Sequence, residues 1–90
     1  MMDPNAPTVR LYMGGIPNMM DSGEVRRMVD HFGILKSFNL VADPEVAGGN
    51  KGYAFFEYYD NKAAEKCIKF LNGFEIGEKR LKVSKAATGQ

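Results

Sequence analysis

Apolar and polar residues alternate along four stretches of the chain, as they do in strands that bury only one face. In residues 9–15 (VRLYMGG), Val9, Leu11 and Met13 fall on one side of the strand, and the residues between them fall on the other. The same period predicts three further strands, in residues 35–41, 50–60 and 80–85. A short hairpin is expected in residues 74–79 (FEIGEK), directly before the last strand.

Two stretches follow a helical period instead. Apolar residues recur at i, i+3, i+4 and i+7 in two sets, Val25, Met28, Val29 and Phe32, and Ala64, Cys67, Ile68 and Leu71. Asp21, with Glu24 three residues later, forms a capping-box pattern that begins the first helix, and Asp60 caps the second. Gly33 and Gly73 follow the last apolar residues and are expected to end the two helices. Each helix has one apolar face that needs a sheet to cover it.

The elements follow one another in the order strand, helix, strand, strand, helix, strand. This order predicts an α+β fold of the ferredoxin-like βαββαβ type, with both helices on one face of a four-stranded antiparallel sheet. The other face of the sheet is left open to solvent. We expect one domain in residues 9–86, with flexible tails at residues 1–8 and 87–90.

The stretch NKGYAFFEYYD, residues 50–60, holds five of the ten aromatic residues of the chain. Strand alternation places Tyr53 and Phe55 on the face opposite to Phe56 and its larger apolar set. If the larger set faces the helices, these two rings stand on the open face. Tyr12 joins them by the alternation of the first strand. Exposed rings on a sheet are unfavourable for solubility, so they indicate a surface that binds a ligand.

Two motifs carry a family resemblance. KGYAFFEY at residues 51–58 resembles the octamer signature of the RNA recognition motif. LYMGGI at residues 11–16 resembles the hexamer of the same family, with Gly15 where asparagine is commoner. The hexamer precedes a helix and the octamer follows the second strand, as in that family. The resemblance implies the ferredoxin-like fold, binding of single-stranded RNA by the open face, and no enzymatic activity or cofactor.

The segment KSFNLV, residues 36–41, narrows the resemblance to members that act in pre-mRNA splicing. Those members bind the polypyrimidine tract before 3′ splice sites. The narrower resemblance implies a pyrimidine-rich RNA ligand, a nuclear location, and contacts with other RNA recognition motifs or splicing-factor domains of a parent protein. We expect the isolated domain to be a monomer.

The resemblance also assigns roles to individual residues. Tyr12 and Tyr53 each stack on a base, and Phe55 packs between neighbouring sugars or bases. Lys51, the basic position of the octamer, pairs with a phosphate. Stacking of this kind is worth roughly 1–3 kcal/mol per base. Three further basic residues are expected to meet phosphates: Arg10, Lys82, which should project from the last strand onto the open face, and Lys85, which follows where the chain leaves the sheet.

Base preference must come from polar groups that read base edges, because stacking tolerates any base. Asn39 lies between inward Phe38 and Leu40, so its amide is expected on the open face. Asn18, in the loop after the first strand, can reach the same edge of the sheet. An amide offers a donor and an acceptor, which suits uracil; the alternative is that both asparagines only satisfy turns and solvent. Glu57, also on the open face, either orders a neighbouring lysine or is solvated, and we expect the latter.

Composition limits the mechanism and excludes several classes of protein. A net charge of +1 is too small for a polycation that binds mainly through phosphates, so stacking must supply much of the affinity. No apolar run approaches the roughly 18 residues of a membrane-spanning helix. One histidine, His31, and one cysteine, Cys67, are too few for a zinc site. Cys67 lies on the apolar face of its helix and is expected to be buried.

Protein binding is the alternative function. Domains of this fold that capture a tryptophan-bearing peptide typically carry Arg-X-Phe after the second helix and lack the aromatic residues of the sheet. This chain reads NGFEIGEKR at residues 72–80 and keeps its rings. GGNKG, residues 48–52, is not a phosphate loop, because no Ser or Thr follows the lysine and no helix begins there. We expect neither a catalytic residue nor a bound metal.

Overall fold

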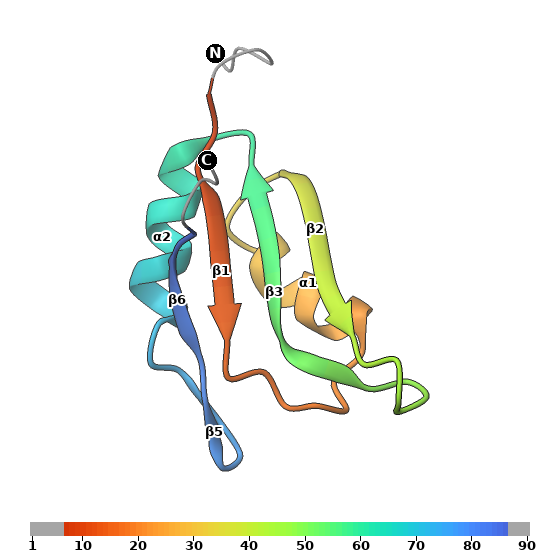
Figure 1. Cartoon of the computed structure of the whole chain (residues 1–90). Helices are drawn as coiled ribbons and strands as arrows, with labels where there is room; N and C mark the ends of the chain where they lie inside the picture. Colours follow the sequence, from red (N-terminus) through yellow and green to blue (C-terminus); the bar gives the residue numbers. More distant parts are fainter. Residues whose placement is uncertain (1–6, 87–90) are drawn as a thin grey trace.

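A computed structural model describes residues 7–86 of the chain. In chain order the elements are β1 (Arg10–Gly14), α1 (Ser22–Asp30), β2 (Leu35–Ala42), β3 (Asn50–Tyr58), α2 (Asn61–Leu71), β4 (Glu75–Ile76), β5 (Lys79–Arg80) and β6 (Lys82–Lys85). Four strands form an antiparallel sheet in the order β2–β3–β1–β6, and Figure 1 shows both helices on the same side of it. The predicted ferredoxin-like fold is confirmed. Residues 1–6 of the first expected tail (residues 1–8) and the whole of the second (residues 87–90) lie outside the described residues.

The two residues that close the first expected tail are attached to the domain. The Pro7 carbonyl accepts a hydrogen bond from Asn61 Nδ2 (3.4 Å), and the Thr8 hydroxyl donates one to Glu57 (2.7 Å). The backbone amide of Val9 donates to Asn61 Oδ1 (3.0 Å). The start of α2 and the end of β3 therefore hold the chain in place before β1 begins.

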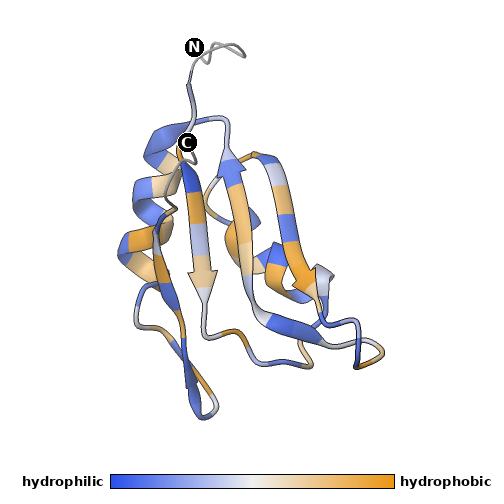
Figure 2. Cartoon of the chain, in the orientation of Figure 1, coloured by the Kyte–Doolittle hydropathy of each residue, from blue (hydrophilic) through white to orange (hydrophobic). Residues whose placement is uncertain are grey.

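The core lies between the sheet and the two helices. The inward residues of β1, β3 and β6 are almost wholly buried, namely Leu11, Met13, Ala54, Phe56, Tyr58 and Val83. The apolar faces of the helices meet them with Val25, Val29, Ala64 and Cys67. Figure 2 shows the alternation as apolar and polar bands along the strands. The one polar atom of the Tyr58 side chain is satisfied, because its hydroxyl donates to the Val29 carbonyl at 2.5 Å.

Both predicted helix starts are confirmed. The Glu24 amide donates to Asp21 Oδ1 at 2.8 Å, and the Asp21 amide donates to Glu24 Oε1 at 2.9 Å, so the capping box is complete. Asp60 accepts a hydrogen bond from the amide of Lys62 at 2.9 Å. Each cap satisfies backbone donors that have no partner inside the helix.

The expectation for Gly33 needs a correction. Helix α1 ends at Asp30, before this glycine, and Gly33 does not adopt the left-handed backbone of a helix-ending glycine. A Cβ atom at Gly33 would lie only 2.6 Å from the Cβ of Ala63 in α2. Close packing between the two helical segments therefore explains this glycine.

The hairpin expected in residues 74–79 is present as β4 and β5, which form a two-stranded sheet of their own. Gly77 makes its turn with a φ of +61°. The predicted final strand, residues 80–85, is divided: Arg80 belongs to the hairpin, and buried Leu81 joins it to β6. The hairpin extends past the end of the main sheet (Figure 1).

Candidate nucleic-acid interface

The open face of the sheet carries three rows of side chains, each running across neighbouring strands as the strand pairing dictates. The Phe55 row consists of Asn39, Phe55, Tyr12 and Ser84. The Tyr53 row consists of Tyr53, Gly14 and Lys82. The Glu57 row consists of Ser37, Glu57 and Arg10. Residues that the sequence separates by tens of positions are thus brought side by side.

The structure places all three expected rings together on this face. The ring centroids of Tyr12 and Tyr53 lie 6.2 Å apart with an interplanar angle of 29°. The ring centroid of Phe55 lies 5.8 Å from that of Tyr12 and 5.9 Å from that of Tyr53. The Phe55 ring is tilted relative to Tyr12 and edge-on to Tyr53. Each ring is half-buried. Because the rings support one another, they form a continuous aromatic surface instead of three isolated side chains.

Gly14 lets the Tyr12 ring lie down on the sheet. A Cβ atom at Gly14 would lie 2.2 Å from the Tyr12 hydroxyl oxygen and 2.7 Å from Cζ. The phenol therefore occupies the space that a side chain at position 14 would need. Sequence analysis did not single out this glycine. Residues two apart in a strand share a face, so the spacing of Gly14 from Tyr12 indicates that the two positions are neighbours.

The basic residues divide between the open face and other surfaces. Arg10 lies over Phe55, with its Cζ atom 4.3 Å from the ring centroid, a cation–π contact. Lys82 pairs with Gly14 and shares the open face. Lys85 pairs with Leu11, whose side chain is in the core, so the register places Lys85 on the helix-bearing side of the sheet. Of the expected phosphate-binding residues, Lys85 is the one that the sheet turns away from the rings.

Lys51 is exposed, but the alternation of side chains along β3 cannot be used to place Lys51 on the same face as Tyr53. Gly52 between them has a φ of +88°, and the pairing of β2 with β3 is irregular beside it. A bulge of this kind breaks the period of two. The position of Lys51 is therefore set by the turn at Gly52 and not by the face of β3.

Asn50, a residue that sequence analysis did not single out, organises the loop before α1. It is 2% exposed, and its Nδ2 donates to the carbonyls of Pro17 (3.0 Å) and Met20 (2.9 Å). Its Oδ1 accepts from the amide of Gly52 at 2.6 Å. Asn18 Nδ2 donates to the Asn50 carbonyl at 3.1 Å. One donor of the Asn18 amide is therefore used inside the loop. This agrees with the alternative interpretation, in which Asn18 satisfies a turn and does not read a base.

Asn39 lies on the open face beside Phe55, where alternation places it, and it is exposed. Among residues 7–86 its amide makes no hydrogen bond, so a ligand can use both its donors and its acceptor. A shallow hollow of about 340 Å³ opens next to it. The hollow is lined by Arg10, Ser37, Phe38, Asn39, Phe55 and Glu57.

Glu57 differs from the expectation of a solvated side chain. It is half-buried, its Oε2 accepts a hydrogen bond from Thr8 Oγ1 (2.7 Å), and its Oε1 accepts one from Ser37 Oγ (3.3 Å). Glu57 makes no ion pair among residues 7–86, but Lys36 Nζ donates to Thr8 Oγ1 (3.4 Å), so a lysine is linked to the carboxylate through the Thr8 hydroxyl. The hydrogen-bond partners of Glu57 come from two distant parts of the chain, so no local sequence signal could have indicated them.

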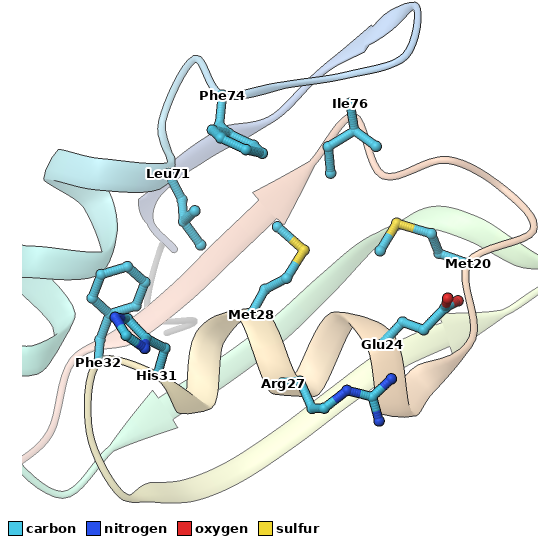
Figure 3. A pocket seen from close by; sticks show the side chains of 9 residues that line it. All are labelled: Met20, Glu24, Arg27, Met28, His31, Phe32, Leu71, Phe74 and Ile76. Carbon is cyan, nitrogen blue, oxygen red and sulfur yellow. The ribbon is translucent and has the colours of Figure 1, made fainter.

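A second hollow, the helix-side groove, lies on the other side of the molecule and measures about 690 Å³. Figure 3 shows the side chains that line it, which come from the loop before α1, α1 and its end, the end of α2, and the hairpin region: Met20, Glu24, Arg27, Met28, His31, Phe32, Leu71, Phe74 and Ile76. Most are apolar, and Phe74 is 49% exposed. His31 packs edge-on against Phe32 with ring centroids 5.2 Å apart.

Cys67 is buried as expected, and burial raises the pKa of its thiol. The thiol therefore stays protonated and unreactive near neutral pH. Within residues 7–86, no three His, Cys, Asp or Glu side chains are grouped as metal ligands would be. In the same residues no helix is long and apolar enough to cross a membrane.

Comparison with known proteins agrees with the two motifs. The profile of the RNA recognition motif family matches residues 11–82. In Arabidopsis thaliana, one large subunit of the splicing factor U2af is 40% identical over 80 residues, which cover 89% of this chain and 14% of the relative. In Triticum aestivum, one large subunit of the same factor is 39% identical over 80 residues with the same coverage. This chain therefore spans only about 14% of the length of these curated relatives.

Solved structures share the fold. The Rna15 RRM with bound RNA (GU) matches with a TM-score of 0.82 and 27% identity, over 91% of this chain and 86% of that chain. The Sxl-lethal protein/RNA complex matches with a TM-score of 0.82 and 28% identity, over 93% of this chain and 50% of that chain. The chain therefore belongs to the RNA recognition motif family, whose members are binding modules and not enzymes.

Proposed function

We propose that this domain binds single-stranded RNA on the open face of its sheet. The observation that carries the proposal is the cluster of Tyr12, Tyr53 and Phe55, three half-buried rings in mutual contact on a face that neither helix covers. Each ring offers a π-face to an unstacked base, at roughly 1–3 kcal/mol per base. This supply of binding energy fits a domain with a net charge of only +1. Duplex RNA is a poor ligand because its bases are already stacked.

Basic residues near the rings supply phosphate contacts. Arg10 stands in the Glu57 row and Lys82 in the Tyr53 row, one on each side of the Phe55 row. An RNA strand that lies along the Phe55 row therefore has a cation on either side. Arg10 lies on Phe55, and it must move from the ring for a base to stack on that face. Lys51 is exposed at the border of the sheet and extends the positive field beyond the rings, whereas Lys85 lies on the helix-bearing side and is not part of this surface.

The preferred ligand is a pyrimidine-rich tract with many uridines. Asn39 presents an unused amide beside Phe55, and an amide can donate to a uracil carbonyl while accepting from its N–H. A pyrimidine is also small enough to lie close beside the rings. Asn18 contributes from the edge of the loop with the donor that its hydrogen bond to Asn50 leaves unused.

The relatives extend this proposal to a biological setting. They are named as large subunits of the splicing factor U2af. We infer that the domain recognises the polypyrimidine tract at 3′ splice sites during pre-mRNA splicing, and that it acts in the nucleus. Other RNA recognition motifs or splicing-factor domains of a parent protein are its expected neighbours. The isolated domain is expected to be a monomer.

Peptide binding is the competing function, and the helix-side groove is the surface that would serve it. Exposed Phe74 and the methionines around it form an apolar site suited to a hydrophobic side chain of a peptide. This groove and the rings lie on opposite sides of the sheet. Substitutions in one surface therefore leave the other intact, and the two functions can be separated experimentally.

The deciding experiment measures binding of fluorescent oligouridine and oligoadenine by anisotropy. Tyr53→Ala is expected to weaken oligouridine binding by about 1–3 kcal/mol, while its circular dichroism stays that of the parent. Phe74→Ala, a matched removal of an exposed ring on the helix side, should leave binding unchanged. Asn39→Ala should weaken oligouridine binding more than oligoadenine binding. Normal RNA binding by a folded Tyr53→Ala variant would refute the proposed function.

A further inference from the structure

The Glu57 row places a carboxylate on the face where RNA is expected. Glu57 is half-buried directly beside the Phe55 row, and a negative charge in that position repels phosphates. Stacking of bases on the three rings makes no use of it. Either the fold alone accounts for the position of Glu57, or this carboxylate recognises a group of the ligand.

The hydrogen bonds that Glu57 makes leave part of its acceptor capacity for a ligand. Thr8 Oγ1 lies 2.7 Å from Oε2 and Ser37 Oγ lies 3.3 Å from Oε1, and each hydroxyl donates its proton to the carboxylate. An ionised carboxylate accepts up to about four hydrogen bonds and donates none. Both carboxylate oxygens therefore keep room for one more donor. The Thr8 hydroxyl oxygen itself accepts a hydrogen bond from Lys36 Nζ (3.4 Å), so the carboxylate and the Ser37 oxygen are the acceptors left for a ligand.

Donors stand on the neighbouring strands. On the β1 side, the guanidinium of Arg10 lies 4.3 Å from the centre of the Phe55 ring and carries five N–H donors. On the β2 side, the Asn39 amide has no internal hydrogen bond among the described residues. The hollow that these groups enclose measures about 340 Å³ and has Phe55 in its wall. A planar base that enters it meets acceptors along one part of its edge and donors along another.

We propose that this hollow is a subsite for a base with an exocyclic amino group, and that this base is cytosine. The proposal rests on the proposed function and deepens it, because it places cytosine at one position of a uridine-rich tract. Cytosine presents an amino donor at C4 next to acceptors at N3 and O2. The amino group donates to Glu57, as carboxylates accept from cytosine N4 in base recognition. The two acceptors are left for Arg10 or Asn39.

Uracil can still pair its O2 and N3–H with the Asn39 amide, as proposed above, but it fits the Glu57 side of the hollow poorly. Its O4 carbonyl stands where cytosine has the amino group, so it would bring an acceptor against the Glu57 carboxylate. Adenine shares the amino group and guanine presents one beside an N–H, but both are larger and depart from the pyrimidine preference proposed for this face. These two purines are therefore the competitors that a test must include.

The test compares the affinities of the domain for a short oligouridine and for the same strand with one central cytidine, adenosine or guanosine. At fixed salt we expect the central cytidine to tighten binding by about tenfold, within the range known for one correct base contact. Glu57→Gln keeps one acceptor oxygen, for either Thr8 or Ser37, and replaces the other oxygen by an N–H₂ group, which can donate to the second hydroxyl and to uracil O4. We expect this variant to lose the preference for cytidine or to favour uridine.

Glu65→Gln is the matched control, because it removes the same charge from an exposed position on α2. Loss of any negative charge strengthens binding of every strand, so the ratio of the cytidine and uridine affinities is the quantity to compare. The inference is overturned if the parent shows no cytidine preference, if Glu57→Gln retains it, or if a central purine binds the parent more tightly than cytidine. Weakening by Tyr53→Ala without any cytidine preference would leave the proposed function standing and refute only the subsite. Unweakened binding in Tyr53→Ala would refute both.

Discussion

A single methyl group added at Gly14 is expected to disable the Tyr12 stacking platform while the fold stays intact. The new Cβ atom would lie 2.2 Å from the Tyr12 hydroxyl oxygen, 2.7 Å from Cζ and 2.9 Å from Cε2. Contacts this short do not persist, so the phenol must leave its place over position 14. Gly14 is not one of the glycines with positive φ, so alanine can adopt its backbone.

The size of the effect follows from how far the ring must move. To reach ordinary contact at 3.4 Å, the hydroxyl oxygen has to retreat by about 1.2 Å, away from its stacked position next to Tyr53. The loss cannot exceed that of removing the ring, roughly 1–3 kcal/mol. We expect Gly14→Ala to weaken oligouridine binding by about 1 kcal/mol, or roughly fivefold in Kd.

The free energy of unfolding should change much less than the free energy of RNA binding. The atoms that clash belong to the free end of a half-buried side chain, which can turn toward solvent without moving the backbone. Alanine also restricts the unfolded chain more than glycine, which favours folding by about 0.4–1 kcal/mol. We therefore expect the free energy of unfolding of Gly14→Ala to lie within about 1 kcal/mol of the parent value.

The assay is a double-mutant cycle with Tyr12→Ala, read by anisotropy for binding and by urea unfolding for stability. Adding Gly14→Ala to Tyr12→Ala should cost no further affinity, because the ring that position 14 displaces is already gone. Gly23→Ala makes the same chemical change in α1, where a Cβ meets only ordinary contacts, and serves as the control. Additive losses in the cycle, or unchanged binding in Gly14→Ala, would refute the reasoning.

Two further predictions concern solution conditions. About two to four phosphate contacts at roughly −0.7 each give a shallow slope of log K against log salt, between about −1.4 and −2.8; a salt titration with a slope near that of a strongly basic protein would contradict a stacking-led interface. Burial raises the pKa values of Tyr58 and Cys67, so the folded chain keeps protons that the unfolded chain releases, and the free energy of unfolding should fall as pH rises above about 9. Urea unfolding across this pH range measures the decline, and Tyr58→Phe should make it less steep.

Local chemistry was enough to predict the elements of this fold. The capping box of Asp21 and Glu24 joins groups three residues apart, and its two hydrogen bonds are present as predicted. Tyr53 and Phe55 stand opposite buried Phe56 because side chains in a strand alternate with a period of two. Interactions between residues this close in sequence do not depend on how distant segments pack, so the sequence pattern alone is enough to predict them.

Other features depend on segments that meet only after folding. Gly33 is required by the approach of Ala63 in α2 and not by a local turn. Asn50 holds a loop about thirty positions earlier in the chain, with partners at separations of 30 and 33 residues. No periodicity connects such residues, so the glycine was assigned the wrong cause and the asparagine was missed.

The sequence by itself determined which face of the sheet stays open and which rings line it, because alternation and element order follow from local backbone geometry. Only the tertiary structure decided what surrounds those rings. Pairing of β1 with β6 sets Lys82 beside Gly14, and pairing of β1 with β3 sets Arg10 beside Phe55. The same packing joins Glu57 to Thr8 across 49 residues. Strand register is a property of two distant segments together, so it fixes neighbours that neither segment can specify alone.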